Sequence, residues 1–366
     1  MDPENFIEVE LSGVFENIKF FIPRSYSDYD PEEHCERCSS LGIVVKFNHR
    51  DNTHSVMIKK FISPYVSKIK TKQVLQEMRL MNTFKHENFV TFLGSYKVQE
   101  EEESDPAMYY ITEHCGNSLR NVIDNSSYSM DQVRKWSREL LRVIDCMHSY
   151  EVVHRNLHPD DICIEGNQLK LLGFGKARSR GLQNSLPAFP YMPIEQLIEC
   201  NGDYDEKVDV WSISALMCEI ITGCSVFHAG NANDSLGLQL QYVELLQVDV
   251  LSKITNVQTG KALRTYSLKN FQNAAFTQVL CDKLRQHGAG RVIKEAHITN
   301  DSSLVDYFDK TLKFNPDRRM TTAAALKHPF MKFTHLWDAP VPPNASLVVN
   351  MLRTLIQREM DCRPIF

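Results

Sequence analysis

The chain has 366 residues, of which 43% are hydrophobic and 24% are charged. This length and composition predict a globular protein with a sizeable core and exclude a fibrous or largely disordered one. A formal net charge of −5 gives no general attraction to nucleic acid or to an anionic membrane, and neither is expected as a partner.

The first residues, "MDPENFIEVELSGVF", have neither the basic start nor the apolar run of a signal peptide, and no later run has the length of a membrane span. The cytoplasm is therefore the expected location, with the nucleus as the alternative. In such reducing compartments the ten cysteines are expected to be thiols rather than disulfides. His34, Cys35 and Cys38 could ligate zinc, but no second paired cluster completes a tetrahedral site, so ordinary loop thiols are favoured.

Strand patterns dominate the first part of the chain. Residues 41–62 mix β-branched and polar residues around the turn "HRDNTH", which predicts a β-hairpin. A helix is expected next, in "KTKQVLQEMRLMNTF", and its buried face is expected to carry Val74, Leu75, Met78 and Met81. The acidic run "EEESDP" is interpreted as a solvated loop before the strand "AMYYIT".

Helical patterns dominate beyond residue 115. Ser129 and Gln132 predict a capping box at the start of a helix. Its apolar stripe consists of Val133, Trp136, Leu140, Ile144 and Met147. The run "VDVWSISALMCEIITG" is apolar on almost every side and ends in Gly223, which predicts a buried helix. The change from strands to helices near "TEHCGNSL" predicts a two-lobed α+β architecture, and clefts between such lobes are common ligand sites.

Five short motifs follow one another in the order that protein kinases show. They are "VMIKK", "HRNLHPDD", "GFG", "PIE" and "VDVWS". The chain from Phe20 to Phe330 therefore resembles a protein kinase. The stretches "QEMRLMNTFKHENFVTFLG" and "PDRRMTTAAALKHPF" resemble the mitogen-activated protein kinase branch.

The resemblance implies a bilobal fold with an extension at each end. Its expected parts are an N-terminal extension at 1–19, a small β-rich lobe at 20–113, a larger helical lobe at 114–330 with a helical insert near 238–270, and a C-terminal extension at 331–366 that packs back on the domain.

For nucleotide binding, the resemblance implies that Lys59 contacts the ATP phosphates and that Glu77 holds this lysine in an ion pair. Val44 and Thr112 match other nucleotide-binding positions. Only Gly42 remains of the three glycines in the phosphate-covering loop, where backbone amides approach the phosphates. ATP binding is therefore expected to be weakened or reshaped.

Four positions lack the residue that phosphoryl transfer uses. Gly173 stands where an aspartate would bind magnesium, and Asn156 where an aspartate would accept the substrate proton. Glycine offers no side-chain oxygen, and a neutral amide is not a general base near neutral pH. His158 replaces a loop lysine, and Asp161 replaces an asparagine that would hold a second magnesium ion. ATP is thus expected to bind, if at all, without magnesium, unless Asp161 serves as a metal ligand.

The regulatory segment differs as well, whereas the structural residues match. The dual phosphorylation positions fall near Gln183 and Ser185, and no threonine occurs between Gly175 and Glu195, so activation by the usual dual-specificity activator is not expected. The matching structural residues are His154, Arg155, Glu195, Asp209 and Arg319. In the segment that would dock basic peptides, only Trp337 and Asp338 remain as candidates.

These residues predict a mitogen-activated protein kinase-like pseudokinase that acts as a scaffold, decoy or allosteric regulator in intracellular signalling. Its expected partners are signalling proteins, such as upstream kinases or active kinase relatives. Two alternatives remain open: a weak ATP-dependent Ser/Thr kinase that uses Asp161 as a metal ligand, and a metal-independent nucleotide sensor.

Overall fold

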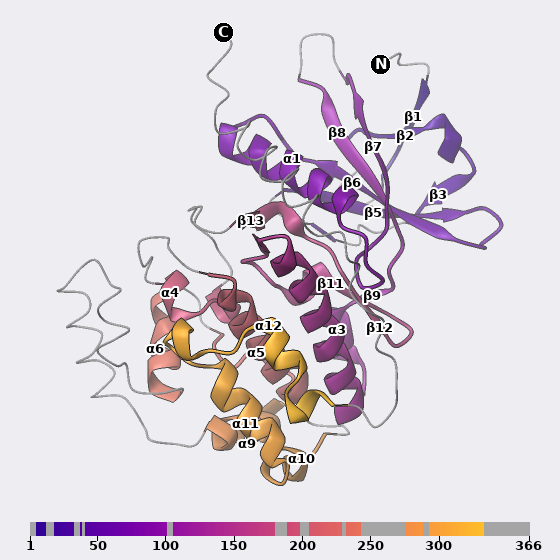
Figure 1. Cartoon of the computed structure of the whole chain (residues 1–366). Coiled ribbons are helices and arrows are strands. Elements are labelled where there is room, and N and C mark those ends of the chain that lie inside the picture. The colour runs from indigo at the N-terminus through magenta and orange to yellow at the C-terminus, as the bar shows by residue number, and fades with distance from the viewer. Residues whose placement is uncertain are drawn as a thin grey trace. The chain divides into compact units, whose positions relative to one another are not determined.

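A computed structural model of the chain (Figure 1) provides the structure. It describes residues 5–11, 18–32, 37–38, 41–100, 105–179, 189–197, 205–228, 232–242, 276–287 and 293–332. The chain forms two compact units. The first unit contains residues 1–117, 162–166 and 170–176, and the second contains residues 118–161, 167–169 and 177–366.

A six-stranded antiparallel sheet forms the centre of the first unit. Its strands are β3 (Tyr29–Pro31), β4 (Arg37–Cys38), β5 (Gly42–His49), β6 (Ser55–Phe61), β7 (Phe92–Val98) and β8 (Ala107–Glu113). The strand order is β3-β5-β6-β8-β7, and β4 also pairs with β5. Strands β1 (Phe6–Val9) and β2 (Phe20–Pro23) form a separate hairpin, which packs on the apolar core of the sheet through Phe20 and Ile22.

The predicted hairpin is confirmed as β5 and β6, with the turn where "HRDNTH" predicts it. Along β5, Ile43, Val45 and Phe47 are buried in the core of the sheet, whereas Val44 and Lys46, which alternate with them, are only half-buried. This alternation follows from the opposite directions of successive side chains in a strand. The register pairs Val44 with Lys59 and thereby fixes the place of the lysine.

Helix α1 (Lys68–Thr83) begins at Ser67, whose side chain accepts a hydrogen bond from the Lys70 amide. Its buried residues are Gln73, Val74, Glu77, Leu80 and Met81. The prediction was wrong for Leu75 and Met78, which are only half-buried. The buried face is centred on the charged Glu77, so apolar periodicity alone could not locate it.

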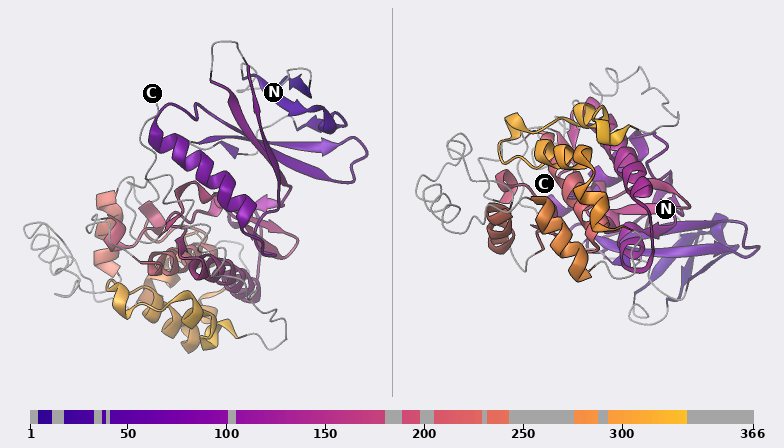
Figure 2. Two further views of the ribbon diagram at one scale, coloured as in Figure 1. Left: turned by 45° about the horizontal axis from the view of Figure 1, so that its top comes forward. Right: turned by 90° about the horizontal axis from the view of Figure 1, so that it is seen from below.

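The second unit consists mainly of helices. They are α2 (Leu119–Asn125), α3 (Met130–Ser149), α4 (Ile194–Leu197), α5 (Lys207–Thr222), α6 (Ala232–Tyr242), α9 (Phe276–His287), α10 (Glu295–Thr299), α11 (Ser302–Thr311) and α12 (Thr322–Leu326). Helix α5 packs against α3, α9 and α11, and α12 packs against α3. Both views of Figure 2 show the orange and yellow helices α10, α11 and α12 gathered together.

Two of these helices match their sequence predictions closely. The capping box between Ser129 and Gln132 is present at the start of α3, and every residue of the predicted apolar stripe is buried. In α5, all residues from Val208 to Thr222 are buried. The helix ends at Gly223, whose φ of 85° lies in the left-handed region that favours glycine.

The remaining strands are short: β9 (Asn117–Ser118), β10 (Val152–Val153), β11 (Ile162–Glu165), β12 (Gln168–Leu171) and β13 (Arg178–Ser179). The α+β fold class, with a strand-rich and a helix-rich part, is confirmed. None of the described helices is long and apolar enough to cross a bilayer. Several predictions concern residues outside the described ranges: His34, Cys35, Gln183, Ser185, Trp337, Asp338 and most of the insert near 238–270.

Candidate functional site

Lys59 and Glu77 form a buried ion pair in the first unit, as their spacing predicts. Lys59 Nζ donates to Glu77 Oε1 at 2.7 Å, and the two side chains are 8% and 1% exposed. The Tyr110 hydroxyl donates to the same carboxylate oxygen at 3.0 Å. Nζ also lies 5.0 Å from the ring centroid of Phe61 and 5.5 Å from that of Tyr110. A carboxylate and two aromatic rings therefore stabilise the ammonium group.

A small apolar cavity lies beside this pair and contains two of the predicted nucleotide-binding residues, Val44 and Thr112. Its lining residues are Val44, Met57, Met81, Val90, Tyr110, Thr112, Cys115, Gly116 and Leu172. The cavity volume is about 30 Å³, whereas small-molecule pockets commonly measure about 300–1,000 Å³. The space suits a water molecule rather than a purine ring.

Met57 accounts for part of the missing volume. The third-strand motif of kinases reads V-A-I-K, with a small alanine two residues before the lysine. Here the motif reads "VMIK", and the Met57 side chain, 6% exposed, lines the cavity. Nucleotide entry therefore requires the flexible Met57 side chain to move or the walls around it to separate.

Cys115 and Cys163 form a disulfide bond at the wall of the same cavity. Their Cα atoms are 5.7 Å apart, a separation that suits a disulfide, and 48 positions separate them in the sequence. With Val90 they form a small buried cluster against which Leu172 packs. The prediction of thiols was therefore wrong for this pair, because sequence distance did not indicate that the two residues meet. Cys146, Cys218 and Cys281 are free thiols, as predicted.

The "GFG" triplet packs into the first unit through its phenylalanine. Phe174 is 1% exposed, and its ring centroid lies 5.4 Å from that of Phe89 and 6.1 Å from that of Phe84. Gly173 has a φ of 86°, a conformation that aspartate and asparagine tolerate better than most residues. A Cβ atom at Gly175 would lie 3.0 Å from Glu77 Oε2 and 2.6 Å from Leu41 Cδ1. The triplet thus keeps its close packing without a carboxylate.

Gly42 lies at the start of β5, opposite Phe61. A Cβ atom at this position would lie 2.3 Å from the carbonyl oxygen of Lys60. The close approach of two strands therefore requires this glycine, whatever its role toward phosphate.

The catalytic-loop backbone of the second unit is held by Asp209, which is fully buried. Its carboxylate accepts hydrogen bonds from the amides of His154 at 2.8 Å and Arg155 at 2.7 Å, and contacts Nε2 of His148 at 2.9 Å. Burial alone would raise the pKa of Asp209, but hydrogen bonding and charge interaction with His148 lower it below its ordinary value. Arg155 has a φ of 72°, so these amide contacts stabilise a backbone conformation that arginine rarely adopts.

The three altered side chains of this loop differ in what they contact. His158 Nδ1 lies 2.9 Å from Asp160 Oδ2, and the His158 ring meets Tyr191 edge to face at a centroid distance of 5.3 Å. Asn156 and Asp161 are half-buried. Among the described residues, Asp161 does not belong to a close group of three or more potential metal ligands.

Tyr191 connects this loop to a polar cluster in the same unit. Its hydroxyl donates to Glu219 Oε2 at 2.6 Å, and Arg120 donates to Glu219 Oε1 at 2.6 Å and to the Tyr191 hydroxyl at 3.0 Å. Burial and the nearby Glu219 raise the pKa of Tyr191 well above its usual range. Tyr191 therefore remains neutral at physiological pH and has a structural role.

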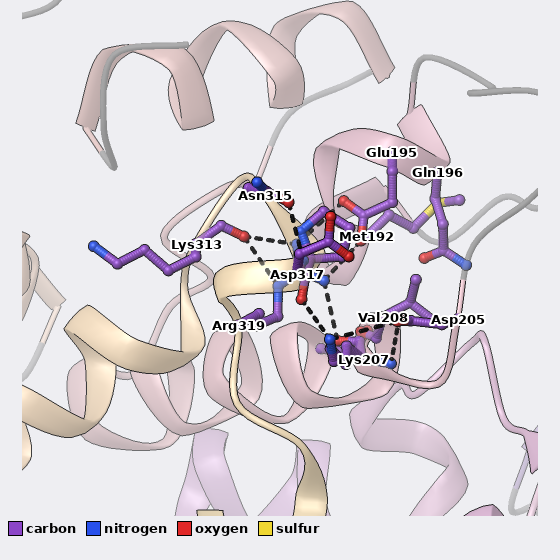
Figure 3. A network of polar contacts seen from close by, with 12 residues as sticks. Met192, Glu195, Gln196, Asp205, Lys207, Val208, Lys313, Asn315, Asp317 and Arg319 are labelled. Atoms are coloured by element: carbon purple, nitrogen blue, oxygen red, sulfur yellow. Dashed lines mark hydrogen bonds and ion pairs between the residues drawn. The ribbon is translucent and has the colours of Figure 1, made fainter. Parts of the chain in front are cut away.

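Glu195 and Arg319 form the second structural pair that the sequence predicts (Figure 3). Arg319 donates to both carboxylate oxygens of Glu195, at 2.7 and 3.2 Å. Its remaining donors bind the carbonyl of Lys313, at 2.7 and 3.0 Å, and the carbonyl of Lys207, at 3.0 Å. The guanidinium is also 5.2 Å from the ring centroid of Trp211. A buried arginine with this many partners fixes several segments of the unit at once.

One position of the kinase magnesium site offers no side-chain ligand in this chain. Mg²⁺ requires oxygen ligands in near-octahedral geometry, and Gly173 provides none from its side chain. Asp161 supplies one carboxylate in the second unit.

Sequence reasoning missed Met57, Cys115 and Leu172 as cavity residues. The departure of "VMIK" from the kinase motif could have identified Met57. No local signal pointed to Cys115, since its importance comes from a partner 48 residues away.

Comparison with known proteins identifies the family. The protein kinase domain family matches residues 39–331. The mitogen-activated protein kinase spk1 of Schizosaccharomyces pombe is 27% identical over 349 residues, which cover 88% of this chain and 87% of that protein. Mitogen-activated protein kinase HOG1A of Wallemia ichthyophaga is 26% identical over 337 residues, with 92% and 84% coverage. Extracellular signal-regulated kinase 1 of Candida albicans is 27% identical over 306 residues, with 81% and 71% coverage.

Proposed function

The chain belongs to the protein kinase domain family and resembles its mitogen-activated protein kinases, and we propose that it is a pseudokinase of this branch, impaired in phosphoryl transfer. It acts by binding other signalling proteins as a scaffold or allosteric regulator. The observation that carries the proposal is the contrast between Gly173, which lacks the metal-binding carboxylate, and the intact Lys59–Glu77 pair in the same unit.

Phosphoryl transfer depends on positioning and on neutralising phosphate charge, and a metal ion supplies much of that charge in kinases. Gly173 removes one metal ligand. Asn156 also removes the group that accepts the substrate proton, a contribution of about 10²–10⁴ in rate. Each loss alone is tolerable in principle, and together they disable two separate parts of the reaction.

The cavity supports the same conclusion for nucleotide binding. The apolar cavity that Val44 and Thr112 line measures only about 30 Å³, which supports weakened nucleotide binding. The Lys59–Glu77 pair itself is the arrangement in which kinases hold this lysine for the phosphates, so it does not oppose nucleotide binding.

The structural contacts that the chain retains are compatible with a role in binding other proteins. The Asp209 contacts and the Glu195–Arg319 pair hold the catalytic-loop backbone and the segment around Glu195 in fixed positions. Such a rigid surface can bind upstream kinases or active relatives without any chemistry. We place this activity in the cytoplasm or the nucleus, where the partners of kinase signalling occur.

A second candidate, a weak kinase, is favoured by the intact Lys59–Glu77 pair and by Asp161, which can ligate a metal. A third candidate, a nucleotide sensor, would bind ATP without magnesium once Met57 moves. Neither requires a change in the described fold.

Thermal unfolding of the full chain with ATP separates the three candidates. A ligand at one hundred times its Kd stabilises the folded state by about 2.7 kcal/mol, a shift that is easily measured. The pseudokinase scaffold predicts no shift at millimolar ATP, with or without magnesium. A magnesium-independent shift that is lost in Lys59→Met would support the sensor. A magnesium-dependent shift that is lost in Asp161→Ala would contradict the proposal and support the weak kinase.

A further inference from the structure

The hairpin of β5 and β6 ends in a cluster of histidines that the kinase resemblance leaves unexplained. We propose that His49, Asp51 and His54 form a binding site for a divalent transition metal, with zinc as the favoured ion. This site is separate from the proposed function, because its residues lie at the turn of the hairpin and not at the nucleotide cavity.

The hairpin brings the two imidazoles together. The His49 amide donates to the carbonyl oxygen of His54 at 3.0 Å, so the two residues face each other where the strand pairing ends. Their rings are nearly parallel, at 19°, with centroids 4.7 Å apart. One ligand atom from each of His49, Asp51 and His54 lies within 4.8 Å of the other two. Small rotations of the side chains bring three such atoms onto one ion.

The third candidate ligand, the Asp51 carboxylate, lies next to the His49 imidazole. Asp51 Oδ1 lies 2.5 Å from Nδ1 of His49 and accepts hydrogen bonds from the Thr53 amide at 2.9 Å and the Thr53 hydroxyl at 2.6 Å. The two hydrogen bonds from Thr53 hold this carboxylate oxygen in place beside the His49 imidazole.

Neighbouring groups orient the imidazoles, as outer-shell residues do in metal sites. Tyr29 of the adjacent strand β3 contacts His54 Nε2 through its hydroxyl at 2.5 Å. Its ring meets both imidazoles edge to face, with centroid distances of 4.9 Å to His49 and 5.4 Å to His54. The Thr53 hydroxyl lies 2.6 Å from the other ring nitrogen of His54, Nδ1. Whichever nitrogen of His54 binds the ion, the other therefore has an outer-shell partner.

The nearest strong cation, Arg50, is paired elsewhere. Its guanidinium lies 3.3 Å from Asp30 and 3.8 Å from Asp28. These carboxylates reduce the repulsion that an unpaired arginine would exert on an incoming cation.

The ligand set favours zinc over magnesium or calcium. Two imidazole nitrogens with one carboxylate suit borderline ions such as zinc, whereas magnesium and calcium prefer oxygen ligands. Three protein ligands leave a fourth position for water. The side chains of His49 and Asp51 are 24% and 52% exposed, so an ion can reach them from solvent.

The competing explanation is a hydrogen-bonded surface turn that needs no metal, and a zinc titration distinguishes the two. The full chain is prepared as Cys35→Ser/Cys38→Ser, because that thiol pair could bind zinc independently. It is stripped with a chelator and titrated with Zn²⁺ by calorimetry. We expect one zinc ion per chain, bound with a micromolar or lower Kd. His49→Gln and His54→Gln should each weaken binding by about 100-fold or more, and Asp51→Asn by about tenfold or more.

His287→Gln provides the matched control, since His287 is an exposed histidine on α9 outside the cluster. Its zinc affinity should equal that of the parent. Metal-free melting temperatures that agree among all variants show that the chain still folds. Cobalt substitution gives a second readout, with visible bands of nitrogen and oxygen ligation and no thiolate charge transfer. Unchanged affinity in the His49→Gln/His54→Gln double variant, or no binding below millimolar zinc, overturns the proposal.

Discussion

The Glu195–Arg319 region of the second unit and the nucleotide cavity of the first differ in what each has kept. The predicted partner of Arg319, Glu195, is in place, and the guanidinium also binds two backbone carbonyls. Around the cavity, Gly173 lacks a carboxylate, Met57 fills space, and about 30 Å³ remains. The difference supports the proposal that the chain retains buried contacts that hold a kinase fold and lacks residues of the reaction.

The largest expected effect comes from removing Arg319 from its buried pair with Glu195. Arg319→Ala leaves Glu195 buried without its partner, and an unpaired buried charge typically costs about 3–5 kcal/mol. Chemical denaturation should therefore show a large loss of stability. Arg285→Ala is the control, because that arginine pairs with Glu295 on the surface and should change stability little. Equal effects of the two variants would show that the buried pair is not essential to the framework.

In the first unit, removing the disulfide between Cys115 and Cys163 tests how much this bond stabilises the region around the cavity. Closing a loop across 48 residues restricts the unfolded chain and is worth about 4 kcal/mol in the chain-entropy model. The free energy of unfolding, measured by chemical denaturation, should fall by about this amount when reductant is added to the parent. Reductant should not change it in Cys163→Ser. A parent that is insensitive to reductant would show that Cys115 and Cys163 are not bonded in solution.

Met57→Ala should open the cavity while weakening the fold. Truncating a buried methionine typically costs about 2–5 kcal/mol. The same variant should gain affinity for adenine-containing ligands, because the added space lies beside Val44 and Thr112. Fluorescent nucleotide binding measures the gain, and Met147→Ala, which removes a buried methionine from α3 of the second unit, is the control for nonspecific loosening. No gain over that control would show that Met57 does not limit nucleotide entry.

The smallest expected effect is a pH dependence centred on Asp209. Its pKa is lower in the folded state than the ordinary value of 3.8, so its carboxylate stabilises the fold above that value. This contribution is lost as the pH falls through the folded-state pKa, which places the loss below about pH 4. Asp209→Asn should cost about 1–3 kcal/mol near neutral pH, because an amide cannot accept all three hydrogen bonds. The difference in unfolding free energy between Asp209→Asn and the parent should shrink below pH 4. A difference that stays constant with pH would show that the Asp209 carboxylate does not stabilise the fold in this way.

Sequence reasoning worked best where the signal was local or where a motif fixed the position. The capping box of Ser129, the glycine at the end of α5 and the Lys59–Glu77 pair are all present as expected. It failed for Leu75 and Met78, because tertiary contacts to Glu77 selected the buried face of α1.

The missed site residues depend on contacts between distant segments. Cys115 precedes β9 and Cys163 lies in β11, which pairs with β9, and a single sequence carries no sign of this pairing. For the histidine cluster, the sequence predicted only a turn at "HRDNTH". The two imidazoles come together because of the register of the hairpin, which the sequence did not specify.

The central claim is that the chain keeps a kinase framework without phosphoryl transfer. Its most direct test is transfer of labelled phosphate from ATP to a generic protein substrate by the purified full chain, with Mg²⁺ or Mn²⁺, beside the Lys59→Met variant. The account predicts equal background labelling by both proteins. Labelling by the parent that Lys59→Met abolishes would contradict it.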